Sequence, residues 1–151
     1  DWSSDVCSSD LNMVTVKPIG QKRLLATAGR HAIVTDRKID EGGTDIGCTS
    51  GELLLSAIGS CATGSLRSYL EKSDLAIEQL EVDVEIEPAA VNSKPGAIGL
   101  TVRLPAEIID SKGAELETAA KSGRVVSRIV LGSDVHVHLQ KIEPASNSQT
   151  R

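Results

Sequence analysis

The chain has 151 residues, of which 40% are hydrophobic and 25% charged, and its formal net charge is -5. This length fits one domain with an ordinary core, and the acidic balance provides no basic stripe for a nucleic-acid backbone. Because no apolar run approaches the roughly 20 residues that cross a bilayer and no secretory signal pattern is present, we expect a cytoplasmic protein that binds neither membrane nor nucleic acid.

Residues 1–12 differ in composition from the rest of the chain. They repeat Ser-Ser-Asp, lack hydrophobic periodicity and precede Met13, where a credible strand pattern begins. We interpret them as a non-native lead, with a native disordered arm as the alternative, and leave them out of the fold reasoning. Without their three aspartates the acidic residues fall from 21 to 18 against 16 basic ones, so the net charge becomes -2. We expect one domain over residues 13–140 and a disordered tail over 141–151.

Three short strands are predicted first, at residues 14–19, 24–27 and 31–34. The last two flank a Gly-Arg turn at residues 28–30, a pattern typical of an antiparallel meander. Residues 35–50 are polar and glycine-rich, which predicts a surface loop.

A long helix is predicted over residues 51–72. Thr49 or Ser50 can cap it, and Glu52 suits the positive end of its dipole. Its first half is apolar on nearly all sides, which predicts burial on most of its surface. One short meander cannot cover such a helix, so we expect a second subunit to pack against it.

The rest of the chain is predicted to form two strands, a helix and a last strand, at residues 80–86, 98–104, 110–121 and 135–139. The first two alternate apolar and polar residues, and turn formers at 88–96 connect them as a hairpin. The helix stops at Gly123, and residues 125–130 lead into the last strand. The order of elements, without βαβ alternation, predicts an α+β fold.

The most specific pattern in the chain is GCTSGELLLSAIGSC at residues 47–61, followed by ATGSLRSYLEK and preceded by GRHAIVTD. A glycine-rich loop, Glu-Leu-Leu-Leu, two small residues and a cysteine at this spacing resemble the OsmC/Ohr family of osmotically inducible and organic hydroperoxide resistance proteins. The resemblance extends from Met13 to about Leu139. It implies antiparallel strands around a long central apolar helix, in an intertwined homodimer.

Cys61 follows Leu54 and Ile58 at helical spacing, which is also what an ordinary buried core cysteine would do. The resemblance implies instead a nucleophile whose thiolate attacks a peroxide oxygen and becomes a sulfenic acid while an alcohol leaves. Such a thiolate needs positive charge beside it. The resemblance assigns that role to Arg30, which on its own would be a solvated loop residue.

Two positions depart from the family pattern. The glutamate that holds the arginine would stand at Gly51, so Glu52 either replaces it or serves only the helix dipole. The resolving cysteine of a Cys-x-Val-Ser stretch would stand at Arg124, which cannot form a disulfide. Arg124 either stabilises the thiolate of Cys61 or is an exposed residue after a helix end.

Other reactive residues give weaker signals. Cys48 precedes the helix, and the helical rise alone separates it from Cys61 by roughly 15 Å, whereas a disulfide needs Cα atoms within about 7 Å. We therefore interpret Cys48 as a loop thiol. His136 and His138 share a strand face, but no third ligand is evident, so no metal site is predicted. No nucleotide or hydrolase motif is present, so no cofactor is predicted.

Two functions remain as hypotheses. The first is a thiol-dependent peroxidase that reduces organic hydroperoxides through Cys61 and Arg30, in a pocket between subunits, with an external thiol as reductant. The second is a homologue without catalysis that binds an apolar ligand or a partner, or senses oxidants stoichiometrically. The absent glutamate and cysteine favour the second, because fold does not carry function with it.

Overall fold

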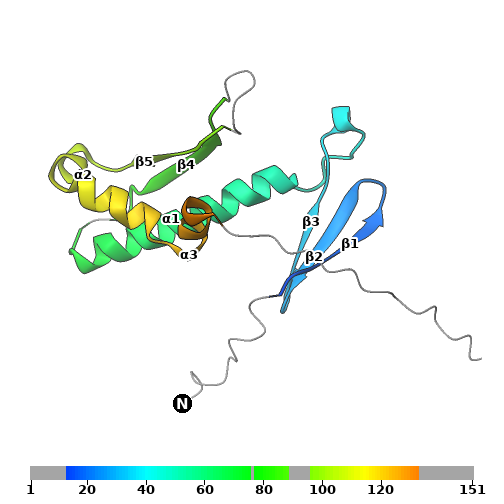
Figure 1. The fold of residues 1–151 in the computed structure, drawn as a ribbon, viewed down its shortest axis with the longest axis horizontal. Coiled ribbons are helices and arrows are strands. Elements are labelled where there is room, and N and C mark those ends of the chain that lie inside the picture. The colour runs from blue at the N-terminus through cyan, green and yellow to red at the C-terminus, as the bar shows by residue number, and fades with distance from the viewer. Residues whose placement is uncertain (1–12, 76, 89–95, 133–151) are drawn as a thin grey trace, which may run out of the picture.

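The computed structural model describes residues 13–75, 77–88 and 96–132 (Figure 1). Three helices and two antiparallel sheets form within these residues, which confirms the α+β class. The lead at 1–12, the tail at 141–151 and the strand predicted at 135–139 lie outside the described residues. Among the described helices, none is both long and apolar enough to cross a bilayer.

The first sheet is the predicted meander of β1 (Thr15–Gly20), β2 (Arg23–Ala28) and β3 (His31–Thr35). Gly29 has a φ of 57° in the tight turn between β2 and β3, a conformation that glycine adopts without strain. Val16, Ala26 and Ile33 are register partners across the strands and therefore lie on one face. Val16 is 56% exposed and Ile33 44%, so the described residues leave this apolar face largely uncovered.

The loop after β3 is organised around a buried carboxylate. Asp36 is only 4% exposed and accepts hydrogen bonds from the backbone N–H of Arg37 at 2.8 Å and from the backbone and hydroxyl of Thr44 at 2.9 and 2.6 Å. These bonds, the Thr44 hydroxyl first, lower the pKa of Asp36 to about 2. The predicted loop is confirmed, with one added 3-10 turn at Ile39–Glu41. The loop ends where the long helix begins.

Helix α1 (Ser50–Lys72) begins one residue before the predicted start and is capped as expected. The Thr49 hydroxyl accepts from the backbone N–H of Glu52 at 3.2 Å, and a Glu52 carboxylate oxygen accepts from the backbone N–H of Thr49 at 2.8 Å. This reciprocal capping box satisfies two first-turn donors.

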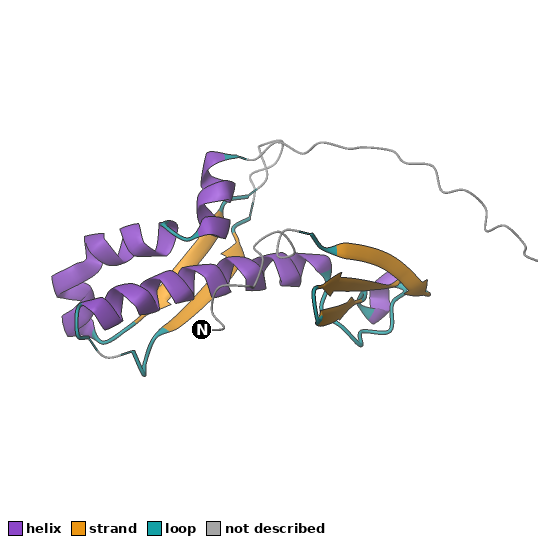
Figure 2. Cartoon of the chain, turned by 90° about the horizontal axis from the view of Figure 1, so that it is seen from below, coloured by secondary structure: helices purple, strands orange, loops and turns teal. Residues whose placement is uncertain are grey.

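A single stripe of α1 is buried, at every fourth position: Ile58, Ala62, Leu66 and Leu70. The predicted burial on most sides of the helix is not reached within one chain, where Leu54 stays 48% exposed. The reason is that α1 contacts α2, β4 and α3, while the main contacts of the β1–β3 sheet are within that sheet. Figure 2 shows the sheet at one end of α1 and the remaining elements around the other.

The second sheet is the predicted hairpin of β4 (Glu81–Ile86) and β5 (Ile98–Arg103). Helix α2 (Ala106–Lys121) follows and lies beside α1 (Figures 1 and 2). It begins four residues earlier than predicted, because the first turn after Pro105 already buries Ile108. The main core cluster joins α1 to α2, and the apolar side chains of the hairpin pack on it: Leu66, Leu70, Ile108, Leu116 and Ala120 with Val82, Val102 and Leu104.

The prediction for residues 125–130 was wrong. They belong to helix α3 (Arg124–Leu131), where the sequence predicted only a connection into the last strand. Their β-branched residues favour a strand locally. The tertiary contact decides otherwise, because Val126 is buried in a second cluster with Ile58 and Ala62 of α1.

Candidate functional site around Cys61

Cys61 lies in the middle of α1, half-buried, where the start of α3 meets that helix. Its Sγ accepts a hydrogen bond from the backbone N–H of Val125 at 3.4 Å. Val125 is the second residue of α3, so this N–H is one of the first-turn donors that have no partner inside the helix. The positive end of α3 therefore points at the sulfur.

Gly123 makes this approach possible. A Cβ at this position would lie 2.4 Å from the Sγ of Cys61 and 2.9 Å from the Oγ of Ser65, much closer than real contacts allow. Gly123 is also the residue that precedes the first turn of α3. The absence of a side chain here allows the main chain of α3 to lie directly against the sulfur.

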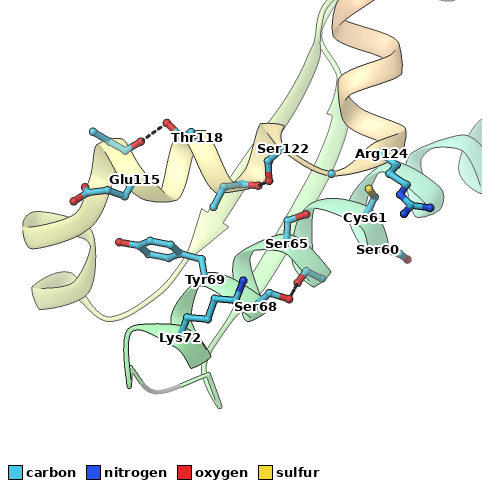
Figure 3. Close-up of a pocket in the computed structure, with 14 residues that line it drawn as sticks. Ser60, Cys61, Ser65, Ser68, Tyr69, Lys72, Glu115, Thr118, Ser122 and Arg124 are labelled. Carbon is cyan, nitrogen blue, oxygen red and sulfur yellow. Dashed lines mark hydrogen bonds between the residues drawn. The ribbon is translucent and has the colours of Figure 1, made fainter. Parts of the chain in front are cut away.

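An open groove of about 960 Å³ runs between α1 and α2, with Cys61 in its wall (Figure 3). Cys61 and Arg124 lie toward one end, and Tyr69 and Lys72 lie toward the other. Its remaining lining is mostly small or hydroxyl-bearing: Ser60, Gly64, Ser65, Ser68, Ala114, Glu115, Thr118, Ala119, Ser122 and Gly123.

Three groove hydroxyls donate to backbone carbonyls of their own helices. Ser68 donates to Gly64 at 3.0 Å and Thr118 to Ala114 at 3.0 Å, and the Ser122 hydroxyl donates to Ala119 at 2.8 Å (Figure 3). Their hydrogens are therefore used within the protein. These three hydroxyl groups therefore need no acceptor from a ligand, so the groove suits an organic chain better than a highly hydrated solute.

The sequence profile described as OsmC-like protein matches residues 42–140, which is more than half of the chain. This protein belongs to the OsmC-like family. A comparison with curated proteins found no match.

Solved structures share the OsmC-like fold at low identity. A Psychrobacter arcticus protein named for osmotic stress induction and detoxification response is 18% identical, with a TM-score of 0.62 over 76% of this chain and 85% of that one. An organic hydroperoxide resistance protein OsmC of Legionella pneumophila is 15% identical, with a TM-score of 0.53 over 79% and 90%. A Vibrio cholerae protein named for organic hydroperoxide resistance, with captopril in one of its active sites, is 15% identical, with a TM-score of 0.56 over 83% and 89%.

Arg124 lies where this OsmC-like chain lacks the expected resolving cysteine, and the structure places it beside Cys61. It is the first residue of α3, lines the groove and is labelled next to the cysteine in Figure 3. The position inferred from the Cys-x-Val-Ser alignment is therefore next to Cys61 in space. A guanidinium stands there in place of a second sulfur.

Arg30 and Glu52 are not brought to Cys61 within the chain. Arg30 is exposed in the turn between β2 and β3 and is not among the residues that line the groove. Glu52 is exposed at the first turn of α1, where the backbone N–H and hydroxyl of Thr49 lower its pKa, and Lys38 Nζ lies 3.9 Å from it. Glu52 was considered as a substitute clamp for the arginine or as a partner of the helix dipole; the structure places it in the first turn of α1, where it completes the capping box.

Sequence reasoning missed the contribution of Gly123 and of the Val125 amide. Residues 125–130 were predicted only as a connection into the last strand, so the helix start that supplies the donor was not foreseen. The available signal was Gly123 itself, since glycine is an accepted N-cap residue. Cys48 lies exposed just before α1, as expected for a loop thiol.

Proposed function

We propose that this OsmC-like protein is a thiol-dependent peroxidase that reduces organic hydroperoxides at Cys61. The observation that carries the proposal is the hydrogen bond from the Val125 N–H to the Cys61 Sγ, at the positive end of α3. A donor and a helix dipole aimed at sulfur favour the reactive anion. The groove between α1 and α2 gives an organic hydroperoxide access to that sulfur.

In the proposed reaction the thiolate of Cys61 attacks the terminal oxygen of the hydroperoxide. The O–O bond breaks, the alkoxide takes a proton and leaves as the alcohol, and sulfur keeps the transferred oxygen as a sulfenic acid. Arg124, beside the sulfur, supports the negative charge that develops during this transfer.

An external thiol completes the cycle in this proposal. Cys61 is the one cysteine that lines the groove among the described residues, and Cys48 lies before the first turn of the same helix. A small thiol can enter the open groove, attack the sulfenic sulfur and displace water. A second thiol then releases Cys61, and a reducing cytoplasm supplies both.

We further propose that the working form is an intertwined homodimer. The uncovered apolar face of the β1–β3 sheet, with Val16 and Ile33, and the exposed Leu54 on α1 suit a second copy of the chain. Such a partner is also the route by which Arg30 can reach a Cys61, since Arg30 does not line the groove of its own chain.

The test is turnover of cumene hydroperoxide with a dithiol as reductant. The unaltered protein is expected to consume many equivalents, and Cys61→Ser should lose this activity because the nucleophile is removed. Cys48→Ser is the matched control and should turn over at the rate of the parent, since Cys48 lies outside the groove. Equal rates for Cys61→Ser and the parent would overturn the proposal.

A stoichiometric oxidant sensor is the second candidate. The observation that favours it is that Glu52 is committed to the helix cap, so no clamp holds Arg30 in one chain. A sensor would form one equivalent of sulfenic acid, which a dimedone probe labels, without consuming further hydroperoxide in the presence of dithiol. Many turnovers with the dithiol would exclude it.

A further inference from the structure

The Val125 amide is a main-chain donor beside Cys61 whose hydrogen is used in no helical hydrogen bond. Cys61 lies well inside the 23-residue helix α1, so the amides that flank it are used in i to i-4 hydrogen bonds. The Val125 N–H belongs to the first turn of α3, and its acceptor is the sulfur, 3.4 Å away. A covalent change at this nitrogen would therefore break no helical hydrogen bond.

The packing around this contact holds the two atoms in place. Gly123 leaves no side chain between the main chain of α3 and the sulfur, since a Cβ there would lie 2.4 Å from Sγ. Val126, the next residue after Val125, is 5% exposed and packs against Ile58 and Ala62 of α1. The sulfur lies along the direction in which the amide hydrogen points, which is also where it would lie if it replaced that hydrogen.

We propose that the sulfenic acid of Cys61 condenses with the backbone nitrogen of Val125 to form a sulfenamide cross-link between α1 and α3. This inference rests on the oxidation step of the proposed function. The S–N bond forms, the S–OH and N–H bonds break, and the hydroxyl leaves with the amide hydrogen as water. The organic hydroperoxide has already oxidised the sulfur, so the condensation needs no further oxidant.

The cross-link would take the place of the disulfide that Arg124 prevents. A sulfenic acid left open to the groove is exposed to a second hydroperoxide, which converts it irreversibly to sulfinic acid. A sulfenamide blocks that step and stays reducible. An external thiol attacks the sulfur, the nitrogen recovers its hydrogen, and a second thiol releases Cys61 with the two external thiols joined as a disulfide.

The experiment uses the full chain with Cys7→Ser and Cys48→Ser, so that Cys61 is the remaining thiol. One equivalent of cumene hydroperoxide is added without reductant, and the intact mass of the monomer is measured. The expected product is two hydrogens lighter than the reduced chain, unreactive to dimedone, and returned to the starting mass by dithiothreitol. Tandem mass spectrometry should find the peptide with Cys61 joined to the peptide with Val125.

Two variants remove the nitrogen donor in different ways. In the first, the α-hydroxy acid analogue of valine replaces Val125, so an ester stands where the amide was and the side chain is kept. The second is Val125→Pro. Both should give a product one oxygen heavier that reacts with dimedone and proceeds to the sulfinic acid with excess hydroperoxide. The matched control is the same ester placed at Val126, which keeps the Val125 N–H and should still form the cross-link.

The outcomes separate this inference from the proposed function. A parent chain that gains one oxygen and keeps it, with full dimedone labelling, would overturn the sulfenamide and leave the peroxidase step intact. Loss of two hydrogens in the ester variant as well would show that another group attacks the sulfur, and would also overturn it. Absence of any oxidation at Cys61 would overturn the proposed function and the cross-link with it.

Discussion

Two regions of the molecule, the β1–β3 sheet and the body formed by α1, α2, α3 and the β4–β5 hairpin, both contain apolar side chains but bury them differently. The hydrophobic residues that the described structure buries all lie in the body, whereas Val16 and Ile33 of the sheet stay half exposed. An amphipathic pattern determines whether a segment forms a helix or a strand, whereas the surface that packs against it determines how far its apolar side chains are buried. The body supplies its own opposite surface, whereas no such surface faces Val16 and Ile33 among the described residues.

The largest expected effect is on the buried stripe of α1. Leu66→Ala should lower the free energy of unfolding by about 2–5 kcal/mol, because Leu66 is fully buried and a cavity remains. Leu54→Ala is the matched control on the same helix and should cost less than about 1 kcal/mol, since Leu54 is 48% exposed. Urea unfolding at low protein concentration measures both. Equal losses of unfolding free energy in the two variants would show that the two ends of α1 do not differ in how much their side chains stabilise the fold.

The contact between α3 and Cys61 is the next most sensitive point. Gly123→Ala should destabilise the chain by about 1–3 kcal/mol through overpacking, since its Cβ would lie 2.4 Å from the sulfur. It should also change the rate at which iodoacetamide alkylates Cys61, because α3 must move away. Gly113→Ala, in the interior of α2 with nothing within 4 Å of its Cβ, is the control and should stabilise by about 0.5–1 kcal/mol. Similar destabilisation by both would refute the close-approach argument.

The boundary between the two regions is the capping box of α1. Thr49→Ala removes the side-chain acceptor for the Glu52 N–H and should lower the free energy of unfolding by about 1 kcal/mol. Ser68→Ala removes a hydroxyl that is bonded within the helix interior, where alanine is the better helix former, and should not destabilise. Thermal unfolding followed by circular dichroism compares the two. An unchanged Thr49→Ala variant would mean that the loop, not the cap, fixes the helix start.

The loop that joins the sheet to the body should give a smaller, pH-dependent effect. Hydrogen bonds, that of the Thr44 hydroxyl foremost, lower the pKa of Asp36 from 3.8 to about 2 in the folded chain. A carboxyl with a lowered folded pKa contributes stability above its unfolded pKa, so this contribution is complete above about pH 4 and is lost as the pH falls toward 2.

The measurement is the difference in urea midpoint between the parent and Asp36→Asn across this pH range. It should shrink as the pH falls, because the parent loses the ionised group that the variant never had. A constant difference from pH 5 to pH 2 would show that ionisation of Asp36 does not contribute to folding.

The smallest effect on the single chain is expected at the sheet surface. Ile33→Lys should change the stability of the monomer by no more than about 0.5 kcal/mol, because the side chain is 44% exposed and, within the described part of the chain, the main contacts of β3 are with β2. The same change should abolish self-association, measured by sedimentation velocity, since a charge would enter the interface. Thr15→Lys, on the other face of the sheet, is the control and should keep the dimer. A dimer that survives Ile33→Lys would reject this face as the interface.

The sequence predicted the elements whose signals are local. Strand alternation, the glycine of the β2–β3 turn and the Thr49 cap placed the sheet, the hairpin and α1 within a residue or two. Helix α3 was not predicted because its β-branched residues favour a strand, whereas in the fold Val126 is buried against α1. Long-range packing of this kind has no local signature.

Some groups of the candidate site could likewise be predicted from the sequence, and others could not. The motif identified Cys61, and alignment of the Cys-x-Val-Ser stretch placed Arg124, which the structure brings next to it. The donor that reaches the sulfur could not be predicted, because it is a main-chain group of Val125 and not a side chain. Arg30 stands at the position of the family arginine and Glu52 is next to the position of the family glutamate, yet in one chain neither residue lines the groove.

The contact at the sulfur has an uneven sensitivity to substitution. Every residue except proline brings a main-chain N–H, so position 125 can accept any apolar side chain of similar size and keep the bond to Cys61. Position 123, two residues earlier, accepts none, because even a methyl group collides with the sulfur. A library that samples all twenty amino acids would therefore show that position 123 rejects substitution, although Gly123 itself takes part in no reaction.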